Sequence, residues 1–387
     1  MKEGWEYKKI KDIGSVIAGT TPNTNVAEYW NGNLCWISPA ELDGSHYLYD
    51  SRKKITEEAV KAKSFRLLPE GTVILSSRAP IGKVVINKIP TYCNQGFKCV
   101  VCGKGIYNEF LYWWFWGKTE YLNSLGTGAT FKEISKKVVE EIVIPVPPLS
   151  EQQHIVDYLD SAFAKIDAMK ANAEKSLDEA KALFQASLKE MLEPKEGTKW
   201  GTIGDLFETY SGGTPTKSNK EYYEGGSIPW LRSGEVCQKE ITETEMFITE
   251  KGLKESSAKY YPENTVVVAM YGATAAQVGI LRIVSTSNQA VCGILPQKDF
   301  LPEFIYYWFS SIEDKLAAQA QGGAQPNISQ QKIKKVEIPI YSITEQQSIV
   351  ATLDSLKSKV DLLQANFDKM SQECDALKQA ILRQVFE

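Results

Sequence analysis

Residues that could support catalysis are scarce in this sequence. The chain of 387 residues has only two histidines, His46 and His154, and neither lies in a motif with a serine, cysteine or acidic partner. A Ser-His-Asp or Cys-His mechanism requires such a partner. The sequence has no Walker-type phosphate loop, and no G-x-G-x-x-G segment follows a predicted strand. We therefore predict no catalytic residues and expect that the chain is not an enzyme.

The cysteines offer one arrangement with the spacing of metal ligands. Cys99 and Cys102 are three residues apart, and Cys93 is near them in the sequence. Residues three apart in a strand point to opposite faces, however, and no second pair or histidine completes a set of four ligands. We predict no metal site and no cofactor bound by this chain.

Most of the sequence occurs twice, which predicts an internal duplication. Ser150 corresponds to Thr344, so the two copies are offset by about 194 residues. Trp36 corresponds to Trp230. The other clear correspondences are residues 19–22 with 212–215, 94–95 with 288–289, 110–115 with 304–309, and 128–130 with 323–325.

Each copy ends in a predicted long helix, over residues 150–193 and residues 344–387. Ser150 and Thr344 each precede a glutamine by three residues, which is the pattern of a capping box. Apolar residues then recur at alternating spacings of three and four, as in a coiled coil. A long helix alone would expose this stripe, so we predict that the two helices form an antiparallel coiled coil. The alternative is an ordinary long core helix. The predicted seam of the second helix is Ile349, Leu353, Leu356, Val360, Leu363, Phe367, Met370, Cys374, Leu377 and Ile381.

The segments before the helices, residues 1–149 and 200–343, are predicted to be two similar globular domains joined through a linker at 194–199. Strand-like runs at 72–75, 83–86 and 96–101 have counterparts at 265–269, 277–283 and 290–295, with loops rich in glycine, proline and asparagine between them. A helix is expected over residues 108–125. The predicted fold class is α+β, with two domains separated by the two helices in a pseudo-two-fold arrangement.

The loops between the predicted strands are rich in the residue types that hydrogen-bond to the edges of nucleic-acid bases. They differ between the copies: residues 76–80 and 270–274 share a place in the repeat but not their side chains. Structural turns are the alternative interpretation. The candidates for DNA contact are Thr20, Thr21, Arg78, Lys83, Thr130, Lys132 and Lys136 in the first copy, and Thr214, Lys217, Thr274, Gln277, Gln325 and Asn327 in the second.

The overall charge does not by itself indicate nucleic-acid binding. The formal net charge is −4, but residues 1–149 hold 19 basic and 15 acidic side chains, and residues 200–343 hold 13 and 16. A local basic face is compatible with these totals. We identify no signal peptide and no apolar run long enough to cross a bilayer. Seven scattered cysteines fit a reducing compartment, so we expect a cytoplasmic protein without membrane contact.

Taken together, the duplicated Gly-x-Thr-Pro loops, the Trp36 and Trp230 segments, and the Glu-Gln-Gln helix starts resemble the specificity subunit of a type I restriction–modification enzyme. The resemblance covers the whole chain. Each short motif is weak alone, but their duplicated order is specific. Two departures are that Thr20 stands where the second copy has Gly213, and that residues 339–342 lack the second proline present at Pro147.

The resemblance implies that each globular domain is a target recognition domain for one half of a bipartite, asymmetric site in double-stranded DNA. It implies that the helices act as a spacer and dock two methyltransferase subunits, and that restriction subunits join this core. S-adenosylmethionine, ATP and magnesium are then expected on the partner subunits. The alternatives are the specificity chain of a fused, type II-like system and a coiled-coil scaffold without a DNA role. The candidates for partner contact are Glu151, Gln152, Gln153, Glu345, Gln346 and Gln347.

Overall fold

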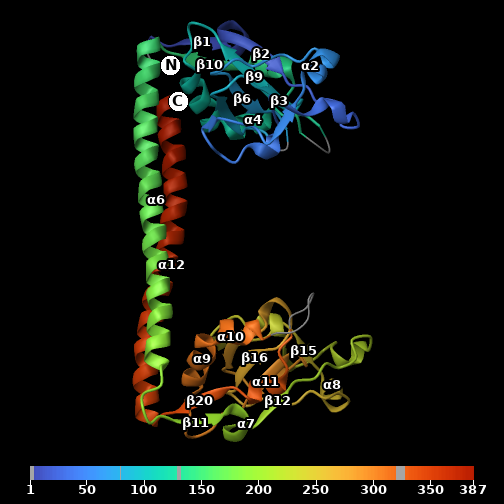
Figure 1. Ribbon diagram of the computed structural model, residues 1–387, viewed down its shortest axis with the longest axis vertical. Coiled ribbons are helices and arrows are strands. Elements are labelled where there is room, and N and C mark those ends of the chain that lie inside the picture. Colours follow the sequence, from blue (N-terminus) through green and yellow to red (C-terminus); the bar gives the residue numbers. More distant parts are fainter. Residues whose placement is uncertain (1–3, 79, 129–131, 320–326) are drawn as a thin grey trace. The chain divides into compact units, whose positions relative to one another are not determined.

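The computed structural model describes residues 4–78, 80–128, 132–319 and 327–387. The chain divides into two compact units, and each is described by itself. Unit 1 comprises residues 1–173 and 368–387, and unit 2 comprises residues 174–367. Each unit therefore contains one globular domain, a part of the first long helix and a part of the second (Figure 1).

The domain of unit 1 is built on a five-stranded sheet, a three-stranded sheet and a two-stranded ribbon. Strands of the five-stranded sheet pair antiparallel except at its edge, where β4 runs parallel to β7. The sheets contain, in spatial order, β2 (Gly14–Ala18), β9 (Phe97–Cys102), β6 (Val73–Ser76), β7 (Val84–Asn87) and β4 (Tyr47–Leu48); then β5 (Lys53–Ile55), β3 (Trp30–Ile37) and β8 (Tyr92–Cys93); and β1 (Glu6–Lys9) with β10 (Val143–Val146).

Unit 2 repeats this topology strand for strand, which confirms the internal duplication. Its two larger sheets have the same connectivity as those of unit 1. They contain β12 (Thr209–Ser211), β19 (Val291–Ile294), β16 (Val266–Ala269), β17 (Val278–Leu281) and β14 (Glu240–Ile241); then β15 (Phe247–Ile248), β13 (Ile228–Leu231) and β18 (Thr286–Ser287); and β11 (Lys199–Thr202) with β20 (Glu337–Ile340).

Short helices complete both domains, and their positions correspond except for η5, which has no counterpart among the described helices of unit 1. The helix expected over residues 108–125 is two helices, because the backbone turns at Lys118 (φ −112°, ψ 24°). Unit 1 has α1 (Ile10–Ile13), η1 (Ala27–Tyr29), η2 (Pro39–Glu41), α2 (Glu57–Lys63), α3 (Asn108–Gly117), α4 (Thr119–Ser124) and α5 (Lys136–Glu141). Unit 2 has α7 (Ile203–Leu206), η3 (Lys220–Tyr222), η4 (Ser233–Glu235), α8 (Glu250–Lys254), η5 (Gly272–Thr274), α9 (Pro302–Ser311), α10 (Glu313–Ala318) and α11 (Gln330–Lys334).

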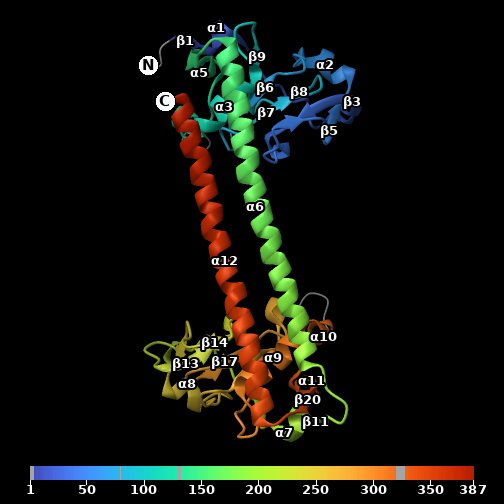
Figure 2. The same cartoon turned by 90° about the vertical axis from the view of Figure 1, so that its left-hand side faces the viewer.

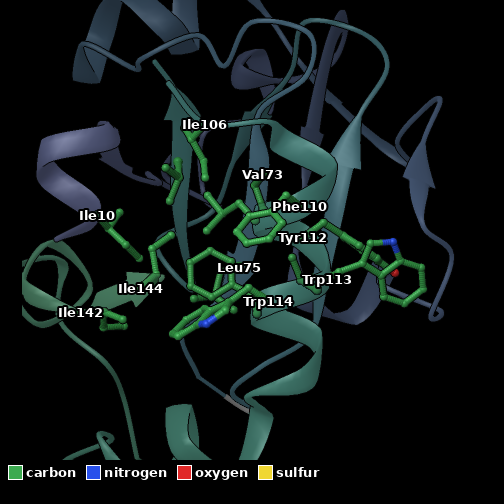
Figure 3. Packing of buried hydrophobic residues seen from close by; sticks show 14 of the residues in the cluster. Ile10, Val73, Leu75, Ile106, Phe110, Tyr112, Trp113, Trp114, Ile142 and Ile144 are labelled. Atoms are coloured by element: carbon green, nitrogen blue, oxygen red, sulfur yellow. The ribbon is translucent and has the colours of Figure 1, made fainter. Parts of the chain in front are cut away.

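The main core of unit 1 lies between the five-stranded sheet and the aromatic helix α3. Figure 3 shows Phe110 and Trp114 of α3 against Val73 and Leu75 of β6, with Ile144 of β10 beside them. The same cluster takes in residues of both long helices, including Leu159 and Phe163 of the first and Leu382 and Phe386 of the second. The domain and the helices of this unit therefore share one hydrophobic core.

The long helices are α6 (Leu149–Leu192) and α12 (Ile343–Phe386). In unit 1, Lys378 pairs with Asp167 (2.5 Å) and Lys170 with Asp375 (3.9 Å), so a step toward the end of α6 is a step toward the start of α12. In unit 2, Leu192 near the end of α6 shares a core cluster with Val350 near the start of α12. The helices pair antiparallel in both units, which confirms the predicted fold class.

Two details of the helices differ from the sequence prediction. Both helices start earlier than predicted: Ser150 lies inside α6, which begins at Leu149, and Ser342 rather than Thr344 caps α12. Glu345 N donates to Ser342 Oγ, and Ser342 N donates to the Glu345 carboxylate. The predicted seam is also incomplete. Leu363 and Leu377 are 42% and 50% exposed, so these two positions do not lie on the covered side of α12.

Candidate nucleic-acid interface

The Gly-x-Thr-Pro loop of each domain is attached to the Asn-Gln segment by the same hydrogen bond. In unit 1, the hydroxyl of Thr21 donates to Gln95 Oε1. In unit 2, the hydroxyl of Thr214 donates to Gln289 Oε1. Both glutamines are exposed, so their amide nitrogens remain available as donors at the surface.

A tryptophan of the three-stranded sheet supports each of these loops. The indole Nε1 of Trp36 donates to the carbonyl of Thr20 (2.9 Å), and that of Trp230 donates to the carbonyl of Gly213 (3.0 Å). Gly19 is required here because a Cβ atom would lie 1.8 Å from the carbonyl oxygen of Asn94. The repeated glycines and tryptophans therefore have a structural role, whereas the threonine–glutamine pairs are presented to solvent.

The predicted DNA residues of unit 1 gather beside this pair. Arg78 forms an isolated β-bridge with Glu133, and its guanidinium lies over Gly96, next to Gln95. Lys132, adjacent to Glu133, is exposed. Thr130 lies outside the described residues. The structure thus brings Thr21 and Arg78 to one polar surface around Gln95.

Two other candidates of unit 1 lie apart from that surface or are already engaged. Lys83 is exposed, but its ammonium donates to the carbonyl of Leu42 (2.7 Å). Lys83 also lines a cavity of about 990 Å³ together with Trp116 and Arg383. Lys136 is in the first turn of α5 and pairs with Glu140 (3.4 Å). Nothing in these contacts favours either lysine as a base-reading residue.

In unit 2 the threonine–glutamine pair borders a cavity of about 490 Å³. Thr214 and Lys217, both predicted, line it, and so do the ring of Trp230 and the guanidinium-bearing Arg232. Arg232 corresponds to Ser38 of unit 1, because each caps a 3-10 helix that ends in a glutamate, Glu235 or Glu41. Sequence reasoning noted the repeated Asn-Gln pairs but did not select them. That repetition is the signal that identifies Gln95 and Gln289.

The remaining candidates of unit 2 differ in how far they are exposed. Asn327 is exposed and bridges Tyr271 as Glu133 bridges Arg78 in unit 1. Thr274 is half-buried in η5, and Gln325 lies outside the described residues. Gln277 is half-buried, and its side-chain oxygen is buried without a hydrogen-bond partner among the described residues. That oxygen does not face a base, and DNA contact by the rest of the side chain stays a prediction.

The compared loops also differ in length, which corrects the sequence alignment. Ser77 accepts a hydrogen bond from Ile134 N through its carbonyl, and Met270 accepts the equivalent bond from Ile328 N. Ser77 therefore corresponds to Met270, whereas the sequence alignment matched Ser76 with Met270. After the loop, the carbonyl of Lys83 accepts a hydrogen bond from Ser76 N, and the carbonyl of Gln277 accepts the equivalent bond from Ala269 N. The loop between Met270 and Gln277 is therefore one residue longer than the loop between Ser77 and Lys83.

The helix starts predicted for partner contact are largely internal. Gln152 and Gln346 are fully buried, and each makes three hydrogen bonds to backbone groups of its own unit. Because neither side chain has exposed atoms, neither lies on a partner surface in this structure. Glu151 accepts a bond from Trp5 Nε1 (2.8 Å), and Glu345 caps its own helix. Gln153 and Gln347 are exposed.

Each domain is also anchored to the long helix that follows it. Trp113 Nε1 of α3 donates to Asp160 Oδ1 of α6 (2.9 Å), and Figure 2 shows the two helices next to each other. In unit 2, Asp354 of α12 accepts bonds from Lys239 and Tyr307. Burial raises the pKa of Asp160, although the indole bond opposes this change. These anchors fix each recognition surface to a rigid helix.

The described residues contain no group of three or more histidine, cysteine or acidic side chains placed to hold a metal ion. Within the same part of the chain, no helix is long and apolar enough to cross a membrane. All seven cysteines are free, including Cys93 and Cys99, whose sulfur atoms are 3.4 Å apart.

Comparisons with known proteins agree with this architecture. The chain matches the family "Type I restriction modification DNA specificity domain" twice, over residues 2–178 and 195–369. It is 32% identical over 377 residues to the type I restriction enzyme MjaIX specificity subunit of Methanocaldococcus jannaschii, covering 91% of this chain and 85% of that protein. It is 24% identical to the type I restriction enzyme EcoKI specificity subunit of Escherichia coli, covering 100% and 89%.

Two solved structures share the fold over the whole chain. One was described under complex assembly and conformational transition of the type I R-M system; it aligns with a TM-score of 0.81 at 18% identity and covers 100% of this chain and 98% of that one. The other is the HsdS subunit from Thermoanaerobacter tengcongensis, with a TM-score of 0.65, 18% identity and coverage of 100% and 97%. With two domain matches and a relative similar over nearly its full length, this chain belongs to the family of type I restriction–modification DNA specificity subunits.

Proposed function

We propose that this chain is the non-catalytic DNA-recognition subunit of a type I restriction–modification enzyme, and that each domain reads one half of a bipartite, asymmetric target. One observation carries this proposal. Both domains present the same threonine–glutamine pair on the same frame, but the side chains around the pair differ, with Arg78 and Glu133 in unit 1 and Tyr271 and Asn327 in unit 2. A common frame with different donors and acceptors suits two different half-sites.

The long helices offer surface for the partner subunits. Several apolar side chains on them are half or more exposed, and a partner that covered them would gain free energy from the apolar area buried. We propose that they help to dock two methyltransferase subunits, with restriction subunits joining the assembly in the cytoplasm. S-adenosylmethionine, ATP and magnesium would then be bound by those partners. The residues concerned are Met169, Leu183, Leu362 and Leu377.

The proposal is tested by sequencing the methylome of a host that expresses this chain with its own methyltransferase. We expect one methylated, two-part sequence with a fixed gap. Exchange of residues 200–343 for those of a relative should change one half of that sequence and leave the other half unchanged. A point variant at an exposed residue of β20, Glu337→Gln, serves as the control, because β20 belongs to the two-stranded ribbon and not to the sheets that carry the polar surface.

Three results would contradict the proposal or favour an alternative. If the exchange altered both halves, the two domains would not read independently. If no methylation appeared and the chain with methyltransferase showed no affinity for duplex DNA, a scaffold without a DNA role would explain the helices better. A methyltransferase fused to its nuclease, encoded beside this chain, would indicate the type II-like system.

A further inference from the structure

A buried lysine in unit 1 connects the recognition surface to the sheet beneath it. Lys98 of β9 is 5% exposed. Its ammonium donates to Ser77 Oγ (2.9 Å), to the carbonyl of Gln95 (3.3 Å) and to Glu133 Oε1 (3.1 Å). Three oxygens thus satisfy the three donors of an ammonium group that would otherwise be costly to bury.

Glu133 is held at the base of the loop over residues 127–133. Its backbone exchanges two hydrogen bonds with Thr127 (2.9 and 3.1 Å), and the next residue, Ile134, donates to the carbonyl of Ser77 (2.9 Å). Its side chain is nevertheless 41% exposed. A carboxylate can accept about four hydrogen bonds, so Glu133 keeps acceptor capacity toward solvent after binding Lys98.

The exposed carboxylate lies on the surface already described. Its backbone bridges Arg78, and Lys98 ties it to Gln95, the partner of Thr21. A free carboxylate on a DNA-binding surface would be repelled by phosphates. The charge of Lys98 compensates that of Glu133, so a carboxylate can be presented there without this penalty.

Unit 2 lacks all three members of this network. In the five-stranded sheet of unit 1, Lys98 is the pairing partner of Leu75 on β6. The equivalent position of unit 2 is Cys292, the pairing partner of Val268 on β16, so a cysteine replaces the lysine. Met270 replaces Ser77, and Asn327 replaces Glu133. The shared fold therefore does not require the network, and its presence in one domain alone indicates a role in what that domain reads.

We infer that Glu133 is a specificity-determining residue of the first domain and that Lys98 is its positioning residue. The inference rests on the proposed function. A carboxylate only accepts hydrogen bonds, and in the major groove the amino groups of cytosine and adenine are the donors that it can recognise. Glu133 accepts a hydrogen bond from such an amino group at one position of the first half-site, and Lys98 fixes the carboxylate in that orientation.

The test uses the full chain expressed with its methyltransferase, and the methylation of a library in which every base of the target is varied. In Glu133→Gln, the amide oxygen can still accept from Lys98, so residue 133 should keep its place beside Ser77 and Gln95. We expect discrimination for cytosine or adenine at one position of one half-site to fall roughly ten- to hundredfold, the range for a lost base contact. The other half-site should be read as before.

Two further variants separate recognition from folding. Lys98→Met should relax the same position, because the carboxylate loses its orientation, and a thermal melt reports whether the domain stays folded. Glu120→Gln removes an exposed carboxylate from the same domain, on α4, and should leave every position unchanged. If Lys98→Met does not fold, the Glu133→Gln variant alone decides whether Glu133 determines specificity.

The outcomes distinguish this inference from the proposed function. If the wild-type chain gives no bipartite methylation, the proposed function fails whatever Glu133 does. If the wild type methylates a bipartite site and Glu133→Gln keeps full discrimination at every position, Glu133 is not a specificity residue. Loss of all methylation by a folded Glu133→Gln variant would make it an anchor of the loop and would also overturn the inference.

Discussion

The indole of Trp113 donates a hydrogen bond of 2.9 Å to the carboxylate of Asp160, and this bond joins α3 of the first recognition domain to α6. The two residues are far apart in the sequence but share one place in the repeat: Tyr307 and Asp354 make the equivalent contact in unit 2. The anchor is polar in both units, although the residues that donate to it differ. It links the reading surface of a domain to the helix that carries it.

Variants of Asp160 test how much this anchor contributes to the free energy of unfolding. Burial raises the pKa of Asp160, so its ionised form is disfavoured in the folded chain, and stability falls as the pH rises through that pKa. Asp160→Ala should cost about 0.5–1.5 kcal/mol because the indole loses its acceptor. Asp160→Asn keeps an oxygen acceptor without the charge and should cost less. Urea unfolding at pH 7 compares the three proteins, and equal losses for both variants would contradict the assignment.

Glu109 and His46 predict a dependence on acid. Burial favours the neutral form of Glu109, but the hydrogen bond from His46 (2.7 Å) and the charges of His46 and Lys88 outweigh it, so the pKa of Glu109 is lowered. A lowered carboxyl pKa stabilises the fold above about pH 4.5, and this stabilisation is lost as the pH falls through the folded pKa. Glu109→Gln should therefore flatten the decline of stability below pH 4.5.

The measurement for Glu109 is hydrogen exchange of peptides from α3, since it reports on unit 1 alone. Wild-type α3 should lose protection between pH 4.5 and pH 3, after correction for intrinsic exchange, and Glu109→Gln should lose less. Glu120→Gln, on the exposed start of α4, provides the matched control and should follow the wild type. A wild-type and a Glu109→Gln profile that coincide would show that the pair with His46 has no such effect.

A third prediction concerns how much the charged pairs between the two long helices stabilise unit 1. Lys378 is only 15% exposed, pairs with Asp167 at 2.5 Å and lies over the ring of Phe163 (5.2 Å). The partner carboxylate is 61% exposed, so the coupling between the two charges should be modest, about 0.2–1 kcal/mol. Lys378→Met should cost more than Asp167→Asn, because it also removes packing against Phe163. A double-mutant cycle in urea measures the coupling, and equal costs for the two single variants would refute the packing contribution.

Sequence reasoning succeeded where a pattern repeats and is local. The duplication, the two long helices and their antiparallel pairing follow from periodicity, prolines and a short linker, and Leu353 is buried as the seam predicts. It failed where burial depends on tertiary contacts. Leu377 has the spacing of a seam residue and is half exposed, whereas Lys98 is charged and buried. Neither fact can be deduced without knowing which oxygens and helices lie nearby.

The candidate site shows the same division. Thr21 and Thr214 were selected from the repeated loops, and the structure places them in equivalent hydrogen bonds. Gln95 and Gln289 were noted as a repeat but not chosen, because their exposure depends on how the strands that follow them are arranged. Glu133 was not among the candidates, because the sequence does not reveal that Lys98 lies beneath it and pairs with its carboxylate.

A variant of Gln152 tests whether this side chain stabilises unit 1 from within or contacts a partner subunit. Its Oε1 accepts from Tyr107 N (2.7 Å), and its Nε2 donates to the carbonyls of Pro147 (2.8 Å) and Gly105 (3.1 Å), all within unit 1. Gln152→Ala would leave these backbone groups without a partner in a buried place. A single unsatisfied group costs about 1–3 kcal/mol, so the loss of stability should reach at least the upper part of this range.

A neighbour and a counterpart serve as controls for Gln152. Gln153 is exposed, and Gln153→Ala should change stability by less than about 0.5 kcal/mol, as at most surface positions. Gln346 makes the same three contacts in unit 2, with the backbone of Leu301, Asp299 and Tyr341. Hydrogen exchange should therefore show loss of protection confined to unit 1 for Gln152→Ala and to unit 2 for Gln346→Ala. If Gln152→Ala were as stable as wild type but bound methyltransferase weakly, the glutamine would be a partner contact after all, and its three internal hydrogen bonds would not explain why it occurs at both helix starts.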